Sequence, residues 1–228
     1  MASVSTGIDT ISDVTMRIRE FTLTTYNNLP NTLFIASLVL GAIQGNLSMI
    51  WVSLGFLFNG AVSVTFQEFL SLLFPKWDQV HQPSSAMCSI VQNFAPGDEK
   101  PYTVVAPSLW FSATSYFVVF ILYNAIQVAI RPVAAGADPK KVDMRIAFSL
   151  SVIMLSIFFF ALLLLRGFTG CETWLGSILG ILIGSGVAIG YWHILDVCNS
   201  GIPPDILNVV SSTAPPATKE RVPVICTA

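Results

Sequence analysis

The sequence predicts an all-α integral membrane protein, with a bundle of about five transmembrane helices and an amphipathic helix before it. Three observations predict this fold class. The 228 residues are 54% hydrophobic and only 11% charged, whereas a soluble domain carries roughly 25% charged residues. The mean hydropathy is +0.71. Several uncharged stretches are long enough to form the helix of about 20 residues that crosses the hydrocarbon core. These totals exclude a disordered chain and a disulfide-dense secreted mini-protein.

The first long apolar stretch, from Thr32 to Phe74, is too long for one transmembrane helix. Its middle, residues 44–48, is polar enough to form an interfacial turn. Two helices are therefore expected, at about 30–45 and 48–74, and the first of them is short. Further spans are expected at about 107–130, 146–166 and 173–195, where uncharged runs recur. Five spans is the expected count; four, with the first segment re-entrant, is the alternative.

The transmembrane domain then covers residues 30–197, with a segment on each side of it. In residues 1–29, apolar side chains recur at helical spacing, at Ile8, Ile11, Val14 and Ile18. This pattern predicts an amphipathic helix, which either lies on the membrane surface or packs on the bundle. The tail, residues 198–228, is rich in proline and is expected to be extended or irregular.

Positive charge between the expected spans predicts the orientation of the chain. The loop 131–145 holds Arg131, Lys140, Lys141 and Arg145, the densest basic stretch of the sequence. The positive-inside rule places this loop and the C-terminal tail in the cytoplasm. Which membrane holds the chain is not encoded in this pattern.

The four cysteines are expected at two different faces of the membrane. Cys88 and Cys171 would share the non-cytoplasmic face, where a disulfide between them is permitted if that side is oxidising. Packing as small apolar free thiols is the alternative. Cys198 and Cys226 would share the cytoplasmic face.

Glycines in the last span predict close helix packing. Gly176, Gly180 and Gly184 form an overlapping small-xxx-small series, which lets a neighbouring backbone approach closely. Packing inside the bundle is the default expectation, and homo-oligomerisation is the alternative.

Few ionisable residues lie in or at the edges of the spans, and such residues are candidates for function. Arg166 and Glu172 flank the turn between the last two spans, where we expect them to form an ion pair; Glu68 could join them at the same face. His193 and Asp196 are three residues apart on one helix face and are expected to act as an interfacial anchor.

The sequence offers no cofactor or metal motif and no nucleic-acid partner. His81 lies in a polar loop without a histidine or cysteine at ligand spacing, and no glycine-rich phosphate loop follows a strand. A net charge of −2 without a basic cluster argues against nucleic-acid binding. The expected partners are the lipid bilayer and other membrane or capsid-type proteins.

In the segment from Leu165 to Trp174, five residues separate an arginine, Arg166, from Glu172, and a Thr-Trp pair follows. This segment resembles the third motif, Ser-Arg-five residues-His, of the type-2 phosphatidic acid phosphatase superfamily, especially of its dolichyl-diphosphatase-like branch. The resemblance covers about residues 50–195. It implies a phosphatase-like helical bundle.

Two further segments fit the other motifs of this superfamily in spacing. Pro107-Ser108-Leu109-Trp110 is similar to Pro-Ser-x-His. Gln67, Phe74 and Pro75 stand at the Lys, Arg and Pro positions of the first motif, Lys-six residues-Arg-Pro.

In active members of the family, the lysine and arginines hold a phosphate, one histidine attacks phosphorus and the other protonates the leaving oxygen. In this chain Glu172 stands at the nucleophile position and Trp110 at the acid position, and only Arg166 remains of the phosphate-binding cations. The resemblance therefore implies the fold and argues against the activity. A glutamate next to Arg166 would supply internally the anion that a substrate brings.

The expected function is accordingly a structural or interaction role for a non-catalytic multi-pass membrane protein. The alternative is an active lipid phosphate or isoprenyl diphosphate phosphatase with an atypical site. A pocket lined by Phe74, Trp110 and Phe111 could still hold an acyl or isoprenoid chain. The last residues, Val222–Ala228, resemble the ends of membrane proteins of large DNA viruses, which implies a virion membrane.

Overall fold

The computed structural model describes residues 14, 17, 24–78, 80–83, 102–133, 138–166, 172–198 and 206. Most of the amphipathic segment 1–29 and of the tail 198–228, together with Cys88, Cys171 and Cys226, lies outside these residues. Five helices and one two-stranded ribbon are described: α2 (Leu29–Gln44), α3 (Leu47–Leu73), β1 (His81–Pro83), β2 (Tyr102–Val104), α4 (Leu109–Ile130), α5 (Pro139–Leu164) and α6 (Trp174–Cys198).

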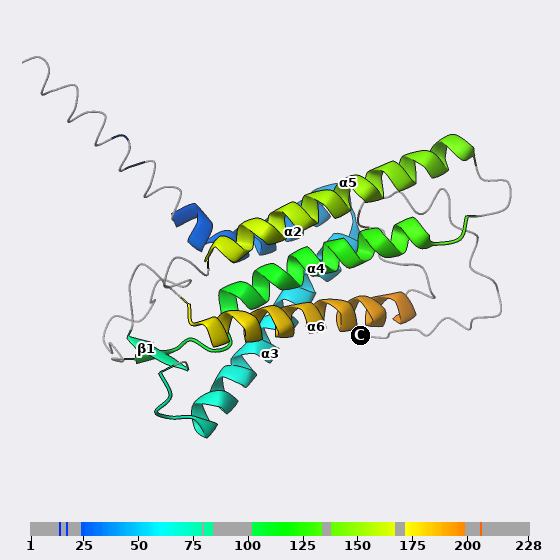
Figure 1. Ribbon diagram of the computed structural model, residues 1–228. Coiled ribbons are helices and arrows are strands. Elements are labelled where there is room, and N and C mark those ends of the chain that lie inside the picture. The colour runs from blue at the N-terminus through cyan, green and yellow to red at the C-terminus, as the bar shows by residue number, and fades with distance from the viewer. Residues whose placement is uncertain are drawn as a thin grey trace, which may run out of the picture.

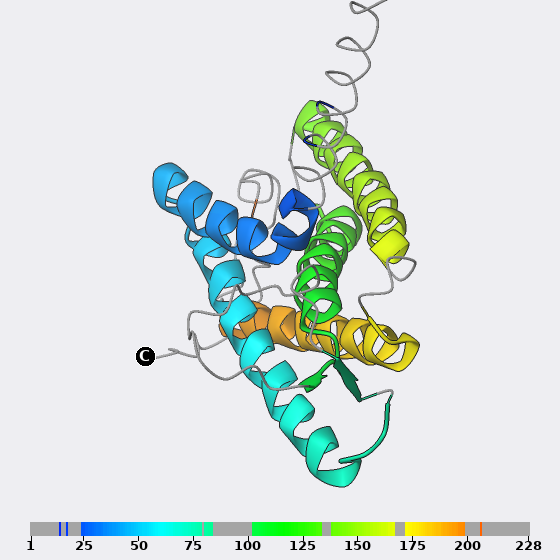
Figure 2. The same cartoon turned by 90° about the vertical axis from the view of Figure 1, so that its left-hand side faces the viewer.

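The helices form a bundle around α4 (Figure 1). Helices α4, α5 and α6 run side by side, while α3 crosses them obliquely and projects beyond the start of α4 (Figures 1 and 2). The antiparallel ribbon pairs His81 with Val104 and lies at that same end of the bundle. We call this the ribbon end; the opposite end, where α4 and α6 finish, is the far end.

Four of the described helices, α3 to α6, are long and apolar enough to cross a membrane. The expected count of five spans is therefore met only in part, because α2 has just 16 residues. The chain is a multi-pass membrane protein by this criterion. Among these four helices α4 is the most buried inside the bundle and α5 the least, so α5 presents most of its surface to the hydrocarbon.

The turn between α2 and α3 falls in the polar stretch where an interfacial turn was expected. Gly45 has a φ of +62°, a left-handed conformation that glycine adopts without a steric penalty. The next residue, Asn46, starts α3: its side chain accepts a hydrogen bond from the Ser48 N–H at 3.0 Å. Its Nδ2 also donates to the Ile206 carbonyl at 2.8 Å, which ties this turn to the chain beyond α6.

Helix α5 begins earlier than the expected span 146–166. Asp138 caps it by accepting a hydrogen bond from the Lys140 N–H at 3.0 Å, and Pro139 occupies the first turn, where its missing N–H costs nothing. Much of the expected basic loop 131–145 is consequently helical. Arg145 is 1% exposed instead of facing solvent, and its Nη2 donates to the Arg131 carbonyl at 2.6 Å.

The glycine series of α6 faces α4. The Ser108 N–H donates to the Gly176 carbonyl at 2.9 Å. A Cβ added at Gly180 would lie 2.6 Å from the Ser108 carbonyl oxygen, and one at Gly184 would collide with Ser112. Only glycine therefore allows this separation between the two backbones. The three glycines are used inside the chain, as the default expectation had it.

Polar side chains gather in the interior of the bundle. The Ser63 and Ser112 hydroxyls lie 2.7 Å apart, and the Ser112 hydroxyl donates to Asn59 Oδ1 at 3.2 Å. The Tyr116 hydroxyl donates to the Val52 carbonyl at 3.2 Å. Each of these side chains is fully or almost fully buried. Within the membrane this arrangement keeps polar groups away from hydrocarbon.

Candidate functional site

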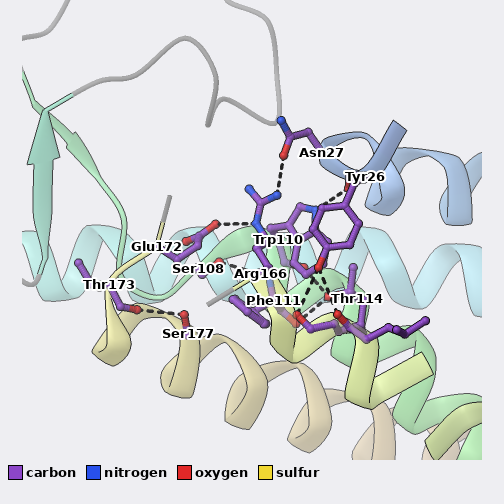
Figure 3. A network of polar contacts seen from close by, with 12 residues as sticks. Tyr26, Asn27, Ser108, Trp110, Phe111, Thr114, Arg166, Glu172, Thr173 and Ser177 are labelled. Atoms are coloured by element: carbon purple, nitrogen blue, oxygen red, sulfur yellow. Dashed lines mark hydrogen bonds and ion pairs between the residues drawn. The ribbon is translucent and has the colours of Figure 1, made fainter. Parts of the chain in front are cut away.

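Six residues from four parts of the chain meet at the ribbon end of the bundle (Figure 3). Arg166 stands two residues after the end of α5, and Glu172 stands two residues before the start of α6. The others stand at the starts of α2 and α4. We call this set the Arg166 cluster: Tyr26, Asn27, Ser108, Trp110, Arg166 and Glu172.

The guanidinium of Arg166 is the centre of the cluster. Its Nε donates to Glu172 Oε1 at 3.4 Å, and its Nη1 donates to Asn27 Oδ1 at 2.6 Å. The side chains of Arg166 and Glu172 are only 1% and 8% exposed. The ion pair expected between these two residues is therefore confirmed, and it is a buried one.

Two aromatic rings enclose the cation. The Arg166 guanidinium carbon lies 4.5 Å from the centre of the Trp110 ring and 6.0 Å from that of Tyr26. The Trp110 Nε1–H donates to the Tyr26 carbonyl at 3.2 Å. A cation over an indole face is attracted by the ring quadrupole, most strongly where water is excluded. Trp110 thus serves as the surface against which Arg166 packs.

Glu172 is held by the start of α4 as well as by the arginine. Ser108 caps α4, since its hydroxyl oxygen accepts a hydrogen bond from the Phe111 N–H at 3.2 Å. The same side chain hydrogen-bonds to the Glu172 carboxylate. Burial raises the pKa of Glu172 above its ordinary value, and the bonds from Ser108 and Arg166 oppose that rise.

Arg166 and Glu172 balance each other in charge. Burial lowers the pKa of Arg166, and Glu172 opposes this change. An arginine pKa lies so high that the group stays charged at neutral pH. With one cation and one carboxylate, the cluster carries no excess positive charge.

The segment expected to supply the first motif joins only through Gln67. Its Nε2 donates to the carbonyl of Pro107, which is buried, at 2.8 Å. Phe74 is 42% exposed at the projecting end of α3, where its ring centre lies 5.2 Å from that of Trp77. Pro75 and Glu68 are also exposed. The expected gathering of Glu68 with the ion pair is therefore absent from the described structure.

His193 and Asp196, which we expect to act as an interfacial anchor, both lie near the end of α6 and contact different partners. His193 Nε2 lies 3.0 Å from the Tyr123 hydroxyl, whereas Asp196 Oδ1 lies 4.0 Å from Arg131 Nη1. Both contacts lie at the far end of the bundle, away from the Arg166 cluster. In the part of the chain that the structure describes, no three His, Cys, Asp or Glu side chains are placed to hold a metal ion.

The pocket expected beside Phe74, Trp110 and Phe111 also takes a different form. Trp110 and Phe111 are 0% and 2% exposed in the core, and Phe74 lies elsewhere. The described cavity opens instead between α2, α4 and α5. Helix α3 extends past the start of α4 and carries Phe74 away from Trp110 and Phe111. The spacing of residues along the sequence does not reveal how far one helix extends past another.

Sequence reasoning missed Asn27 and Tyr26. Asn27 accepts the shortest described hydrogen bond of Arg166, yet in the sequence it is only a polar residue before a span. The contact between Asn27 and Arg166 was not expected, because residues 1–29 were treated as a segment separate from the transmembrane domain. Cys198, which was expected with Cys226 at a cytoplasmic face, is disulfide-bonded, and its partner lies outside the described residues.

No protein-family model, curated protein or solved structure matches this chain. The likeness to lipid phosphatases thus depends on the residues and the spacing of the motif-like segments.

Proposed function

We propose that this chain is a non-catalytic multi-pass membrane protein with a lipid-phosphatase-like scaffold, in which the Arg166 cluster joins helices instead of binding phosphate. The observation that carries the proposal is the buried, charge-balanced pair of Arg166 and Glu172, 1% and 8% exposed. The meeting of the two segments that resemble the second and third family motifs, around Ser108–Trp110 and Arg166–Glu172, supports the scaffold.

Phosphate binding requires positive charge that is not already neutralised. Arg166 is engaged by Glu172, by Asn27 and by the face of Trp110. An entering phosphate would meet the Glu172 carboxylate at close range, and like charges repel strongly where water is excluded. Gln67, at the position of the family lysine, donates to a backbone carbonyl and brings no charge.

Hydrolysis through a phosphoenzyme requires a nucleophile and an acid that titrates near neutrality. Trp110 and Glu172 occupy the two histidine positions, and an indole N–H cannot act as such an acid. The described His193 lies at the far end of the bundle, bonded to Tyr123. The cluster therefore supports a structural role, in which it fixes the starts of α2, α4 and α6 to the end of α5.

The test is phosphate release by the detergent-purified protein from phosphatidic acid and from an isoprenyl diphosphate. Wild type is compared with Arg166→Lys, which keeps the charge but loses the planar bonds, and with Lys76→Ala as a matched change of an exposed cation. We expect equal, background release from all three proteins.

Turnover by wild type and Lys76→Ala that is lost in a folded Arg166→Lys protein would overturn the proposal. The alternative, an active phosphatase with a rebuilt site, would then hold, and Glu172 would be the first residue to replace. Gel filtration of each variant establishes that it is folded.

A further inference from the structure

An apolar groove lies between α2 and α5, with α4 as its floor. Figure 2 shows α2 and α5 on either side of α4. The groove has a volume of about 150 Å³, and its lining includes Leu33 of α2, Phe117 and Ile121 of α4, and Leu155 and Phe159 of α5. Apart from Ser156, every residue that lines it is apolar.

Water is a poor occupant of this groove. An apolar cavity of about 150 Å³ in a soluble protein stays dry and takes up apolar guests, because water inside it would lack hydrogen-bond partners. The middle of α4, from Phe117 to Ile121, forms the floor, so the groove lies at the depth of the hydrocarbon rather than at the aqueous surface. The molecules available at that depth are lipid chains.

The length of the groove selects one kind of chain. Its lining on α5 extends from Val152 to Leu163, which is about 16 Å at 1.5 Å per residue. The hydrocarbon core is roughly 30 Å thick, so the groove covers the depth of one leaflet, from the bilayer centre to the ribbon end. That is the depth that one acyl chain of a bilayer lipid occupies.

The groove ends below the Arg166 cluster. Leu163 lines the groove and also packs with Trp110 in a buried apolar cluster, and the Trp110 ring covers Arg166. The Tyr26 hydroxyl donates to the carbonyls of Leu162 and Leu163, both at 3.4 Å. These side chains separate the groove from the ion pair, so a chain in the groove need not bring its head group to Arg166.

We propose that this groove binds one acyl chain of a bilayer glycerophospholipid from the leaflet at the ribbon end. The chain fills the space between α2 and α5 and joins the two helices through α4. This site is independent of the proposed function, since it requires neither catalysis nor its absence.

The test is lipid retention after reconstitution. The full-length protein is placed in vesicles of dioleoylphosphatidylcholine, extracted in a mild non-ionic detergent and examined by native mass spectrometry. Ser156, which is 6% exposed, lines the groove, so Ser156→Phe fills the space. Ser151→Phe introduces the same side chain at an exposed position of α5, and Ser156→Ala leaves the groove open.

We expect wild type, Ser151→Phe and Ser156→Ala to retain one phosphatidylcholine mass. Ser156→Phe should retain it roughly tenfold less, since methylene-sized changes in an apolar pocket have effects of this order. Circular dichroism and gel filtration establish that each variant is folded, and Ser156→Leu replaces Ser156→Phe if the latter is not.

Three results would overturn the inference: no lipid mass on wild type, detergent adducts only, or equal lipid retention by Ser156→Phe and Ser151→Phe. A dimer that Ser156→Phe abolishes without loss of lipid would assign the groove to a second copy of the chain. Phosphate release plays no part in these readouts, so failure here leaves the proposed function in place.

Discussion

Arg166 is a charged side chain whose surroundings were built from several distant parts of the sequence. Its partners, Asn27, Trp110 and Glu172, come from three other segments. A buried ion pair adds little net stability compared with apolar residues, but removing one partner leaves the other charge buried and uncompensated. Arg166 is therefore important for stability mainly because its loss would leave the Glu172 carboxylate buried without a counter-charge.

We predict that Arg166→Met destabilises the protein by about 3–5 kcal/mol at neutral pH, because Glu172 is left without its cation. The double variant Arg166→Met/Glu172→Gln should recover most of this loss. Unfolding in mixed detergent micelles measures both changes. Lys76→Met, which alters an exposed cation at the end of α3, should change stability by less than about 0.5 kcal/mol. Equal stability of the two single variants would contradict the prediction.

The raised pKa of Glu172 predicts a pH dependence with a definite sign. Because burial raises this pKa above its ordinary value of 4.5, the folded state binds the proton more tightly than the unfolded state does. The contribution of Glu172 to the free energy of unfolding is therefore largest below pH 4.5, and it is lost as the pH rises through the raised pKa of the folded state. Wild type should thus lose stability relative to Glu172→Gln over that interval.

Unfolding measured for both proteins in steps between pH 4 and pH 8 checks this prediction. The difference between the two curves isolates Glu172 from the other carboxylates, which titrate in both proteins. A wild type that gains stability relative to Glu172→Gln as the pH rises would contradict it.

At the scale of helices, the close contact between α4 and α6 depends on glycines, which have no side chain. The backbones approach where Gly180 and Gly184 face Ser108 and Ser112, and the outward Gly186 has open space around its α-carbon. Glycine is therefore required at Gly184, where the two backbones meet, whereas the structure has room for a side chain at Gly186, two residues further along the same helix.

We predict that Gly180→Ala destabilises the protein by about 1–3 kcal/mol through overpacking. Gly186→Ala, as the matched control, should be neutral or should stabilise α6 by up to about 1 kcal/mol, because alanine favours the helix more than glycine does. Thermal unfolding of both variants in detergent gives the comparison, and a more stable Gly180→Ala would be inconsistent with the close approach.

Hydropathy and helix-breaking residues predicted the helices within a few residues where apolar runs end sharply, as at Ile130. The start of α5 was missed because Lys140, Lys141 and Asp143 lower the hydropathy of its first turns, although Asp138 and Pro139 are ordinary helix-start residues. Contacts between distant segments, such as that of Asn27 with Arg166, carry no local signal. The Arg166–Glu172 pair could be predicted because only five residues separate these two residues, which stand at the adjoining ends of consecutive helices.

At the scale of the whole molecule, the orientation in the membrane rests on two opposing features at the far end. Lys140 and Lys141 favour the cytoplasm for that end, but Arg145 is buried and Arg131 lies 4.0 Å from Asp196. Cys198, at the same end, is disulfide-bonded, and disulfides persist mainly in oxidising compartments. The burial of Arg145 weakens the case for a cytoplasmic far end.

We predict that the far end faces the oxidising side of its membrane. Cys198 should react with maleimide only after reduction, and a Lys140→Cys variant should be labelled by an impermeant maleimide from that side of sealed vesicles. Peptide mass analysis locates each label. Labelling of unreduced Cys198 from the cytoplasmic side would support the orientation that the basic residues favour.

The unequal lengths of α2 and α3 also affect the lipid around the protein. Helix α2, with 16 residues, is about 24 Å long, whereas α3, with 27 residues, is about 40 Å long. A bilayer that meets the apolar surface of α2 without a gap is thinner there than the roughly 30 Å average. Such hydrophobic mismatch is relieved by local thinning and sorts proteins among membranes. The bilayer should therefore be thinner on the side of α2 than beside α3 to α6, the helices that are long enough to span it.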